Sequence, residues 1–290
     1  MTAQKNQLNW QVGGKSVRGA AHIRHNLPNQ DAISWLGGTG SGLPIALAVS
    51  DGHGSARYFR SDRGAALAVD SATTLLYDLA TNQTGDTSLS ALKRAAEERL
   101  PQALVRHWQE QVQAALAHTP LTDEELAQLA DKSGLAARQT VLDQPLLAYG
   151  ATLVAVLVTE TYILYLQLGD GDILTVADDL SVSRPPLAGD ERLFGDETTS
   201  LCTNESWRDM RVCFQAIVHT PPALIVLSTD GYSRSFTEES GFLQVGSDLL
   251  QMLRSDGFAT VQAELPGWLE EASQSGSGDD ISLGFLWKCD

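Results

Sequence analysis

The stretch Val49-Ser50-Asp51-Gly52-His53-Gly54-Ser55-Ala56 follows the apolar residues 44–48 without interruption. An apolar run of that length is typical of a buried strand, and Asp-Gly commonly forms the turn at a strand end. This turn places the carboxylate of Asp51 two residues from the imidazole of His53. The segment is therefore either an ordinary turn or part of an active site, and the rest of the sequence has to distinguish the two.

Acidic residues recur at the ends of other apolar runs. They are Asp31 before residues 32–36, Asp170 after residues 162–168, Asp230 after residues 224–227, and Asp279 with Asp280 before residues 281–286. One Asp-Gly pair at a strand end usually forms only a turn. Carboxylates from several strands can instead converge at one edge of packed sheets, where their mutual repulsion favours bound cations.

Converging carboxylates suit hard divalent ions, because Mg²⁺ and Mn²⁺ prefer oxygen ligands. Two such ions about 3.5–4 Å apart can activate a water molecule for phosphoester hydrolysis. In that setting His53, with an ordinary pKa of about 6.5, could protonate the leaving alkoxide. The alternative for His53 alone is a surface histidine in a turn.

Composition limits the classes of function. The 290 residues carry a formal net charge of −16, which argues against binding to nucleic acid or to anionic membranes. The three cysteines, Cys202, Cys213 and Cys289, lack zinc-site spacing and are typical of thiols in a reducing compartment. The N-terminal residues lack the features of a secretory signal and no run is long enough to span a bilayer, so we predict a cytoplasmic protein.

The order of elements predicts one α+β domain in which helices cover antiparallel sheets. Expected strands are 10–12, 32–36, 44–49, 151–158, 162–166, 173–176, 211–216, 223–227 and 281–286. Expected helices are 62–79, 88–118 with a break at Pro101, 122–130 with a Thr122/Glu125 capping box, 247–254 and 259–273. Residues 131–145 are expected to form a loop, and residues 181–204 a long surface excursion.

Six short motifs, in this order, resemble the PPM/PP2C metal-dependent serine/threonine protein phosphatases, in particular their bacterial branch. The motifs are Asn29-Gln30-Asp31-Ala32, Val49-Ser50-Asp51-Gly52-His53-Gly54, Tyr149-Gly150-Ala151-Thr152-Leu153-Val154, Leu168-Gly169-Asp170-Gly171-Asp172, Leu227-Ser228-Thr229-Asp230-Gly231 and Gly278-Asp279-Asp280-Ile281-Ser282. Each is weak alone, but together they cover about residues 19–287. The resemblance implies a single domain over residues 1–290, with a variable flap at about 185–204. It also implies a four-layer α-β-β-α sandwich of two antiparallel sheets flanked by helix pairs.

The resemblance further implies hydrolysis of phosphoserine and phosphothreonine in proteins at a centre of two or three Mg²⁺ or Mn²⁺ ions. Asp51 would bridge the two central ions, and the carbonyl of Gly52 would bind one of them. Asp230 and Asp279 would hold the first ion, Asp31 would support the second through water, and Asp170 would belong to an accessory third site. His53 would be the proton donor. A phosphoprotein substrate and a cognate serine/threonine kinase are the implied partners.

Three positions depart from the family pattern. Asp280 stands where the family usually has Asn, so either Asp279 or Asp280 could face the metal, and we expect Asp279. Residues 169–172 read Gly-Asp-Gly-Asp in place of Gly-Asp-Ser-Arg. Asn26 stands at the position of the usual phosphate-binding arginine, so we expect Arg24 to bind phosphate.

Two other functions are compatible with parts of this pattern. The missing arginine favours a catalytically weak or inactive module that binds a phosphoprotein or a kinase. An acidic Ca²⁺-binding protein is disfavoured, because the sequence has no contiguous EF-hand loop.

Overall fold

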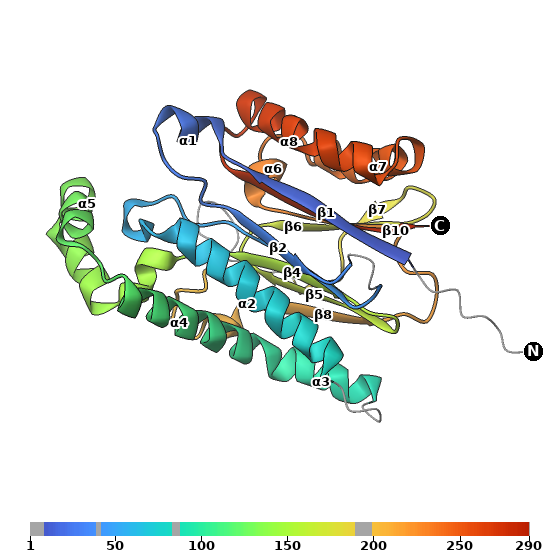
Figure 1. Ribbon diagram of the computed structural model, residues 1–290, viewed down its shortest axis with the longest axis horizontal. Helices are drawn as coiled ribbons and strands as arrows, with labels where there is room; N and C mark the ends of the chain where they lie inside the picture. The colour runs from blue at the N-terminus through green and yellow to red at the C-terminus, as the bar shows by residue number, and fades with distance from the viewer. Residues whose placement is uncertain (1–8, 39–41, 83–87, 189–198, 290) are drawn as a thin grey trace, which may run out of the picture.

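The computed structural model describes residues 9–38, 42–82, 88–188 and 199–289. Two five-stranded antiparallel sheets stack face to face at its centre (Figure 1). The first sheet has the order β1 (Asn9–Val17), β10 (Ile281–Cys289), β9 (Leu224–Ser228), β6 (Asp172–Val176) and β7 (Val182–Ser183). The second has the order β2 (Ala32–Leu36), β3 (Ile45–Ser50), β4 (Leu153–Val158), β5 (Tyr162–Leu168) and β8 (Arg211–Ala216).

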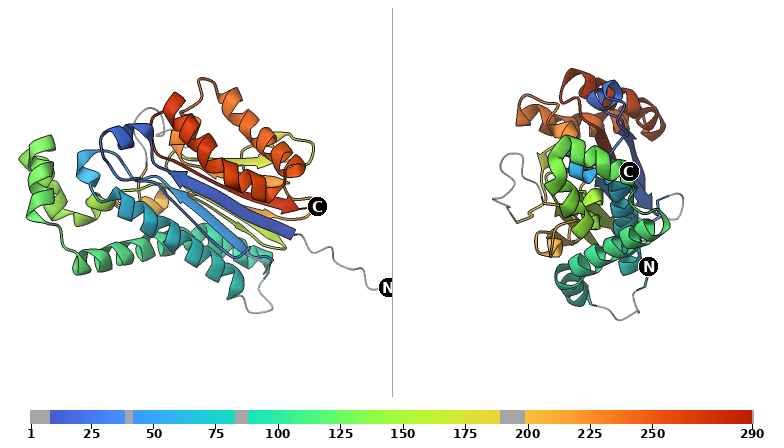
Figure 2. Two further views of the ribbon diagram at one scale, coloured as in Figure 1. Left: turned by 45° about the horizontal axis from the view of Figure 1, so that its top comes forward. Right: turned by 90° about the vertical axis from the view of Figure 1, so that its left-hand side faces the viewer.

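Helices cover the outer face of each sheet, which confirms the predicted four-layer sandwich (Figure 2). The first sheet packs against α7 (Glu239–Ser255) and α8 (Phe258–Ser275). The second packs against α2 (Ser61–Thr81), α3 (Leu89–Glu98) and α4 (Leu100–His118). No helix in the described part of the chain combines the length and the apolar character that crossing a membrane requires.

Strand β3 shows why its sequence is apolar without interruption. Ala46 and Ala48 face the helices of the second sheet, whereas Ile45, Leu47 and Val49 face the other sheet. Successive side chains of a strand point to opposite faces, so a strand in an inner layer needs an apolar residue at every position. The apolar run at residues 45–49 therefore places β3 in the middle of the sandwich.

The prediction of a loop at residues 131–145 is wrong. Helix α5 (Asp123–Asp143) continues through them with a break at Gly134, whose φ of 85° is unusual for other residues, and η2 (Pro145–Tyr149) follows. Most side chains in the second half of α5 are exposed. The helix therefore has no apolar stripe from which its period could be predicted.

Smaller differences concern the lengths of other elements. Helix α7 begins at Glu239, eight residues before the predicted start at residue 247. The short helices α1 (Ala20–Arg24) and α6 (Asp230–Ser233) were not predicted, because four or five residues are too few to reveal a helical period. Residues 189–198 of the expected flap lie outside the described residues, so the flap stays a prediction.

The buried side chain of Arg60 holds α5 against the sandwich. Its Nε and Nη2 both donate to the carboxylate of Glu125 at 2.8 Å. Its Nη1 donates to the carbonyl of Thr119 at 2.7 Å and to the hydroxyl of Tyr149 at 2.8 Å. The predicted capping box of Thr122 and Glu125 is present. One carboxylate thus both caps α5 and ties it to the start of α2.

Candidate metal centre

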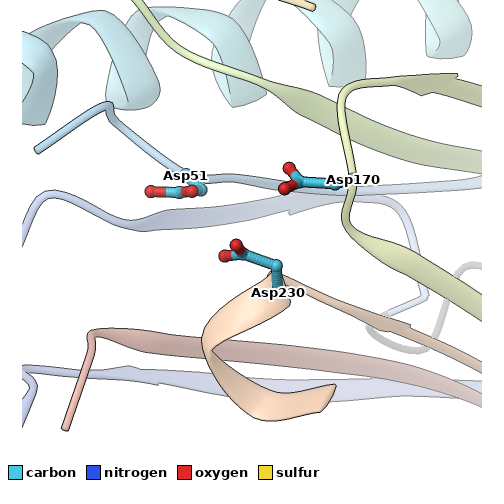
Figure 3. A group of neighbouring side chains, drawn as sticks. All are labelled: Asp51, Asp170 and Asp230. Carbon is cyan, nitrogen blue, oxygen red and sulfur yellow. The ribbon is translucent and has the colours of Figure 1, made fainter. Parts of the chain in front are cut away.

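Three of the predicted carboxylates converge at one end of the sandwich. Asp51 follows β3, Asp170 lies in the connection between β5 and β6, and Asp230 is the first residue of α6. One carboxylate oxygen from each lies within 4.8 Å of the other two. Figure 3 shows the three side chains gathered in the space between these segments. Residues up to 179 positions apart in the sequence are therefore close enough to share an ion.

Asp31 and Asp279 complete the group of predicted metal ligands, but they lie in different environments. Asp31 is 8% exposed, and its Oδ2 accepts a hydrogen bond of 2.6 Å from the hydroxyl of Thr229. Asp279 has a side chain that is 47% exposed and lines the same cavity as Asp51. Asp31 thus supports the group from beneath, and Asp279 borders it from the open side.

Burial and mutual repulsion make Asp31, Asp51 and Asp230 hard to ionise. Burial raises the pKa of Asp51 well above its usual value, and the charges of Asp31 and Asp230 raise it further. Burial and the charge of Asp170 raise the pKa of Asp230 to about 6. A divalent ion would reverse both effects, because it favours the ionised carboxylate. An all-oxygen set of carboxylates, of which Asp31 and Asp230 are buried, therefore fits Mg²⁺ or Mn²⁺.

Gly52 allows the backbone after Asp51 to lie close to its neighbours. A Cβ atom at this position would stand 2.6 Å from the carbonyl oxygens of both Gln30 and Ser61. The Gly52 amide donates to that Gln30 carbonyl at 3.1 Å. Only glycine therefore allows the backbone at position 52 to approach Gln30 and Ser61 this closely. The contact fixes the backbone that carries Asp51 and His53.

The acidic group borders an open cavity of about 590 Å³. Its lining includes the sequence-predicted residues Asp51, Gly52, His53, Asp170, Asp230 and Asp279, together with Arg57 and Arg234. Arg24 is exposed on α1 and is not among the residues that line this cavity. The cavity lining thus includes two arginines that the sequence analysis missed, whereas Nη2 of Arg24 lies 3.9 Å from the position of a Cβ at Gly278, next to Asp279.

Only one of the two missed arginines left a signal in the sequence. Arg234 stands four residues after Asp230, a spacing that places two side chains on one face of a helix. Arg57 belongs to η1 (Ala56–Tyr58), and no spacing rule points from there to the cavity. Its position depends on how η1 packs against α5 and η2.

His53 lines the cavity with its ring 4.8 Å from the ring of Tyr58. Burial lowers the pKa of His53 to about 4, and the nearby charge of Arg57 contributes in the same direction. The imidazole is therefore neutral at pH 7 before any substrate binds. The charge of Asp170 opposes this effect, so negative charge in the cavity favours protonation.

The two adjacent aspartates before β10 have different surroundings. Asp280 is 3% exposed, and its two oxygens accept hydrogen bonds of 2.6 Å from the amides of Gly19 and Gln30. Nδ1 of His22 lies 2.8 Å from the same carboxylate. The Asp280 carboxylate is therefore occupied by contacts within the protein, whereas Asp279 lines the cavity. This arrangement is compatible with the expectation that Asp279 faces the metal.

Comparison with known proteins assigns this chain to a family. The model of the family described as "Protein phosphatase 2C" matches residues 18–270. None of the curated proteins matches the sequence significantly. Among solved structures, the catalytic domain of the serine/threonine phosphatase PstP, in complex with two manganese ions, is 16% identical. That match covers 97% of this chain and 99% of that one, with a TM-score of 0.55.

Two further structures share the fold at similarly low identity. Serine/threonine phosphatase Stp1 from Staphylococcus aureus is 13% identical over 98% of this chain and 95% of its own, with a TM-score of 0.57. PppA, a regulatory component of the type VI secretion system (T6SS) of Pseudomonas aeruginosa, is 17% identical over 97% and 98%, with a TM-score of 0.55. Identities this low carry the fold alone, whereas the family model covers most of the chain. The chain belongs to the protein phosphatase 2C family.

Proposed function

We propose that this protein hydrolyses phosphoserine and phosphothreonine in proteins at a centre of two Mg²⁺ or Mn²⁺ ions. The observation that carries the proposal is the convergence of Asp51, Asp170 and Asp230 at the wall of an open cavity. Asp31, Asp51, Asp230 and Asp279, with the carbonyl of Gly52, would hold the ions. When bound, such ions supply a water molecule of lowered pKa and stabilise negative charge on the phosphoryl oxygens.

Arg57 is proposed to bind the phosphate group. It lines the cavity, and its guanidinium carbon lies 5.3 Å from the centre of the Tyr58 ring. Within the described residues no ion pair engages Arg57, so its donors are available to a ligand. A planar guanidinium can donate two parallel hydrogen bonds to phosphate oxygens.

His53 is proposed to give a proton to the leaving oxygen of serine or threonine. Alkoxides leave poorly unless they are protonated, so a donor at this oxygen accelerates the reaction. His53 is neutral in the empty cavity, and the negative charge of a bound phosphate would raise its pKa. Phosphate binding therefore prepares the donor. A cognate serine/threonine kinase, as the supplier of the substrate, is part of the same proposal.

Phosphate release from an aryl phosphate and a phosphothreonine peptide in the presence of Mn²⁺ tests the proposal. We expect Asp51→Asn to abolish activity on both substrates. Asp178→Asn is the matched control, because Asp178 pairs with Arg254 and Lys288 away from the cavity. Equal activity of wild type and Asp51→Asn would refute the mechanism. Tight phosphopeptide binding without turnover would support the alternative of an inactive binding module.

A further inference from the structure

The guanidinium of Arg234 joins two carboxylates of the candidate metal centre. Its Nη1 lies 2.8 Å from Oδ2 of Asp230, and its Nη2 lies 3.1 Å from Oδ2 of Asp170. Arg234 follows directly on α6, and its backbone amide donates to the carbonyl of Asp230 at 2.8 Å. Arg234, at the end of α6, therefore places a positive charge between these two acids.

Charge balance at the site makes this contact significant. Five carboxylates surround the candidate centre, namely those of Asp31, Asp51, Asp170, Asp230 and Asp279. Two divalent ions and one guanidinium together carry five positive charges. Asp280 does not enter this count, because His22 and two backbone amides already contact it. Two ions and Arg234 therefore balance these five carboxylates, and Arg57, which also lines the cavity, remains for the phosphate group.

Geometry favours arginine for this role. Its planar, forked head presents separate N–H groups, so it can contact two carboxylates at once. The neighbouring acid Asp172 does not compete for Arg234, because Arg184 lies 2.9 Å from it and also pairs with Glu239. Asp170 and Asp230 thus have a dedicated cation that belongs to the protein.

We propose that Arg234 is a built-in cation that takes the place of a third divalent ion beside Asp170, so that the centre holds two divalent ions and no third. This inference rests on the proposed function, since it presupposes a binuclear centre. It replaces the expectation from the family resemblance that Asp170 belongs to an accessory third site. Arg234 acts here as a positioning residue, because it contacts the carboxylates and not the reacting atoms.

Counting Mn²⁺ ions per chain by native mass spectrometry and isothermal titration calorimetry tests the inference without any turnover. We expect two ions in the wild type and also in Asp170→Asn. Arg234→Gln removes the charge at similar length, and Arg234→Asp adds a ligand; both should bind a third ion. Adding Asp170→Asn to Arg234→Gln should return the count to two.

Arg184→Gln is the matched control, because Arg184 also bridges two carboxylates but does not line the metal cavity. Its ion count should equal that of the wild type, and circular dichroism should show that every variant is folded. Three ions in the wild type would overturn the inference, as would two ions in both Arg234 variants. If wild type binds two ions but releases no phosphate, the proposed function fails while the inference stands. One ion or none would overturn both.

Discussion

Substitutions of the single residues Arg57 and Arg24 should have different effects on substrate binding. Arg57 lines the cavity, whereas Arg24 is exposed on α1 and was chosen from the sequence because it lies near the usual position. A charge-assisted hydrogen bond contributes about 1.5–3 kcal/mol. We therefore expect Arg57→Ala to raise KM for a phosphothreonine peptide roughly 10- to 100-fold, and Arg24→Ala to leave it unchanged.

Steady-state kinetics on the two variants would decide between these arginines. Arg63→Ala serves as the control, because Arg63 is an exposed arginine on α2 that does not line the cavity. A large effect of Arg24→Ala with a normal Arg57→Ala would restore the sequence-based choice.

The proton-donor role of His53 predicts a dependence on the leaving group. A positioned acid accelerates departure of a poor leaving group by about 100-fold or more. We expect His53→Ala to reduce kcat on a phosphothreonine peptide by about 100-fold, but to reduce kcat on an aryl phosphate by less than about tenfold. Equal losses on both substrates would argue against proton donation and for a purely structural role.

The attachment of α5 is the main prediction at the level of elements. Burial alone would raise the pKa of Glu125, but hydrogen bonds from Arg60 and Thr122 lower it to about 2. A carboxylate with a lowered pKa in the folded state stabilises that state above its unfolded pKa of about 4.3. This contribution is lost as the pH falls through about 2.

Glu125→Gln should therefore destabilise the fold by about 1–3 kcal/mol at pH 7, because it leaves buried Arg60 without its charged partner. The difference from wild type should shrink as the pH falls from about 4.5 toward 2. Urea unfolding at several pH values measures it, and Glu124→Gln, at the neighbouring exposed position, is the control. A difference that does not change with pH would contradict the assigned ion pair.

Elements were predictable from the sequence where burial imposes a period. Strands β3, β4 and β9 lie in the inner layers and are apolar except for the last residue of β3 and of β9, so their positions followed directly from the sequence. The second half of α5 has mostly exposed side chains, and its sequence therefore looks like that of a loop. Helix α7 likewise begins with three exposed residues, 239–241, although Phe242 and Gly246 in its next turns are buried.

The site was predictable to the extent that strand ends determine it. The sequence predicts that Asp51, Asp170 and Asp230 lie close together, because each adjoins an apolar run. Of the two cavity arginines, Arg234 could have been found from its four-residue spacing after Asp230. Arg57 could not, since its long side chain reaches the cavity from a position with no fixed relation to a strand. The different surroundings of Asp279 and Asp280 could not be predicted either, because the amides of Gly19 and Gln30 that contact Asp280 come from distant segments.

At the scale of the whole molecule, divalent ions should stabilise the fold. A ligand at 100 times its Kd stabilises the folded state by about 2.7 kcal/mol, since the unfolded chain has no preformed site. For a chain of this size we expect saturating Mn²⁺ to raise Tm by about 5 °C relative to EDTA. Calorimetry should show the shift in wild type and Asp178→Asn, and little of it in Asp51→Asn. A shift equal in all three proteins would indicate binding elsewhere.

The candidate ligands belong to both halves of the sandwich. Asp31 and Asp51 adjoin strands of the second sheet, Asp230 and Asp279 adjoin strands of the first, and Asp170 lies in a connection between the sheets. A relative shift of the two layers would change the distances between the carboxylate oxygens that hold an ion. An ion bound at this centre would contact ligands from both sheets and would therefore oppose movement of one layer relative to the other. Substitutions at the interlayer residues Leu47 or Leu227, whose side chains cannot bind a metal ion, should therefore change the affinity for the metal.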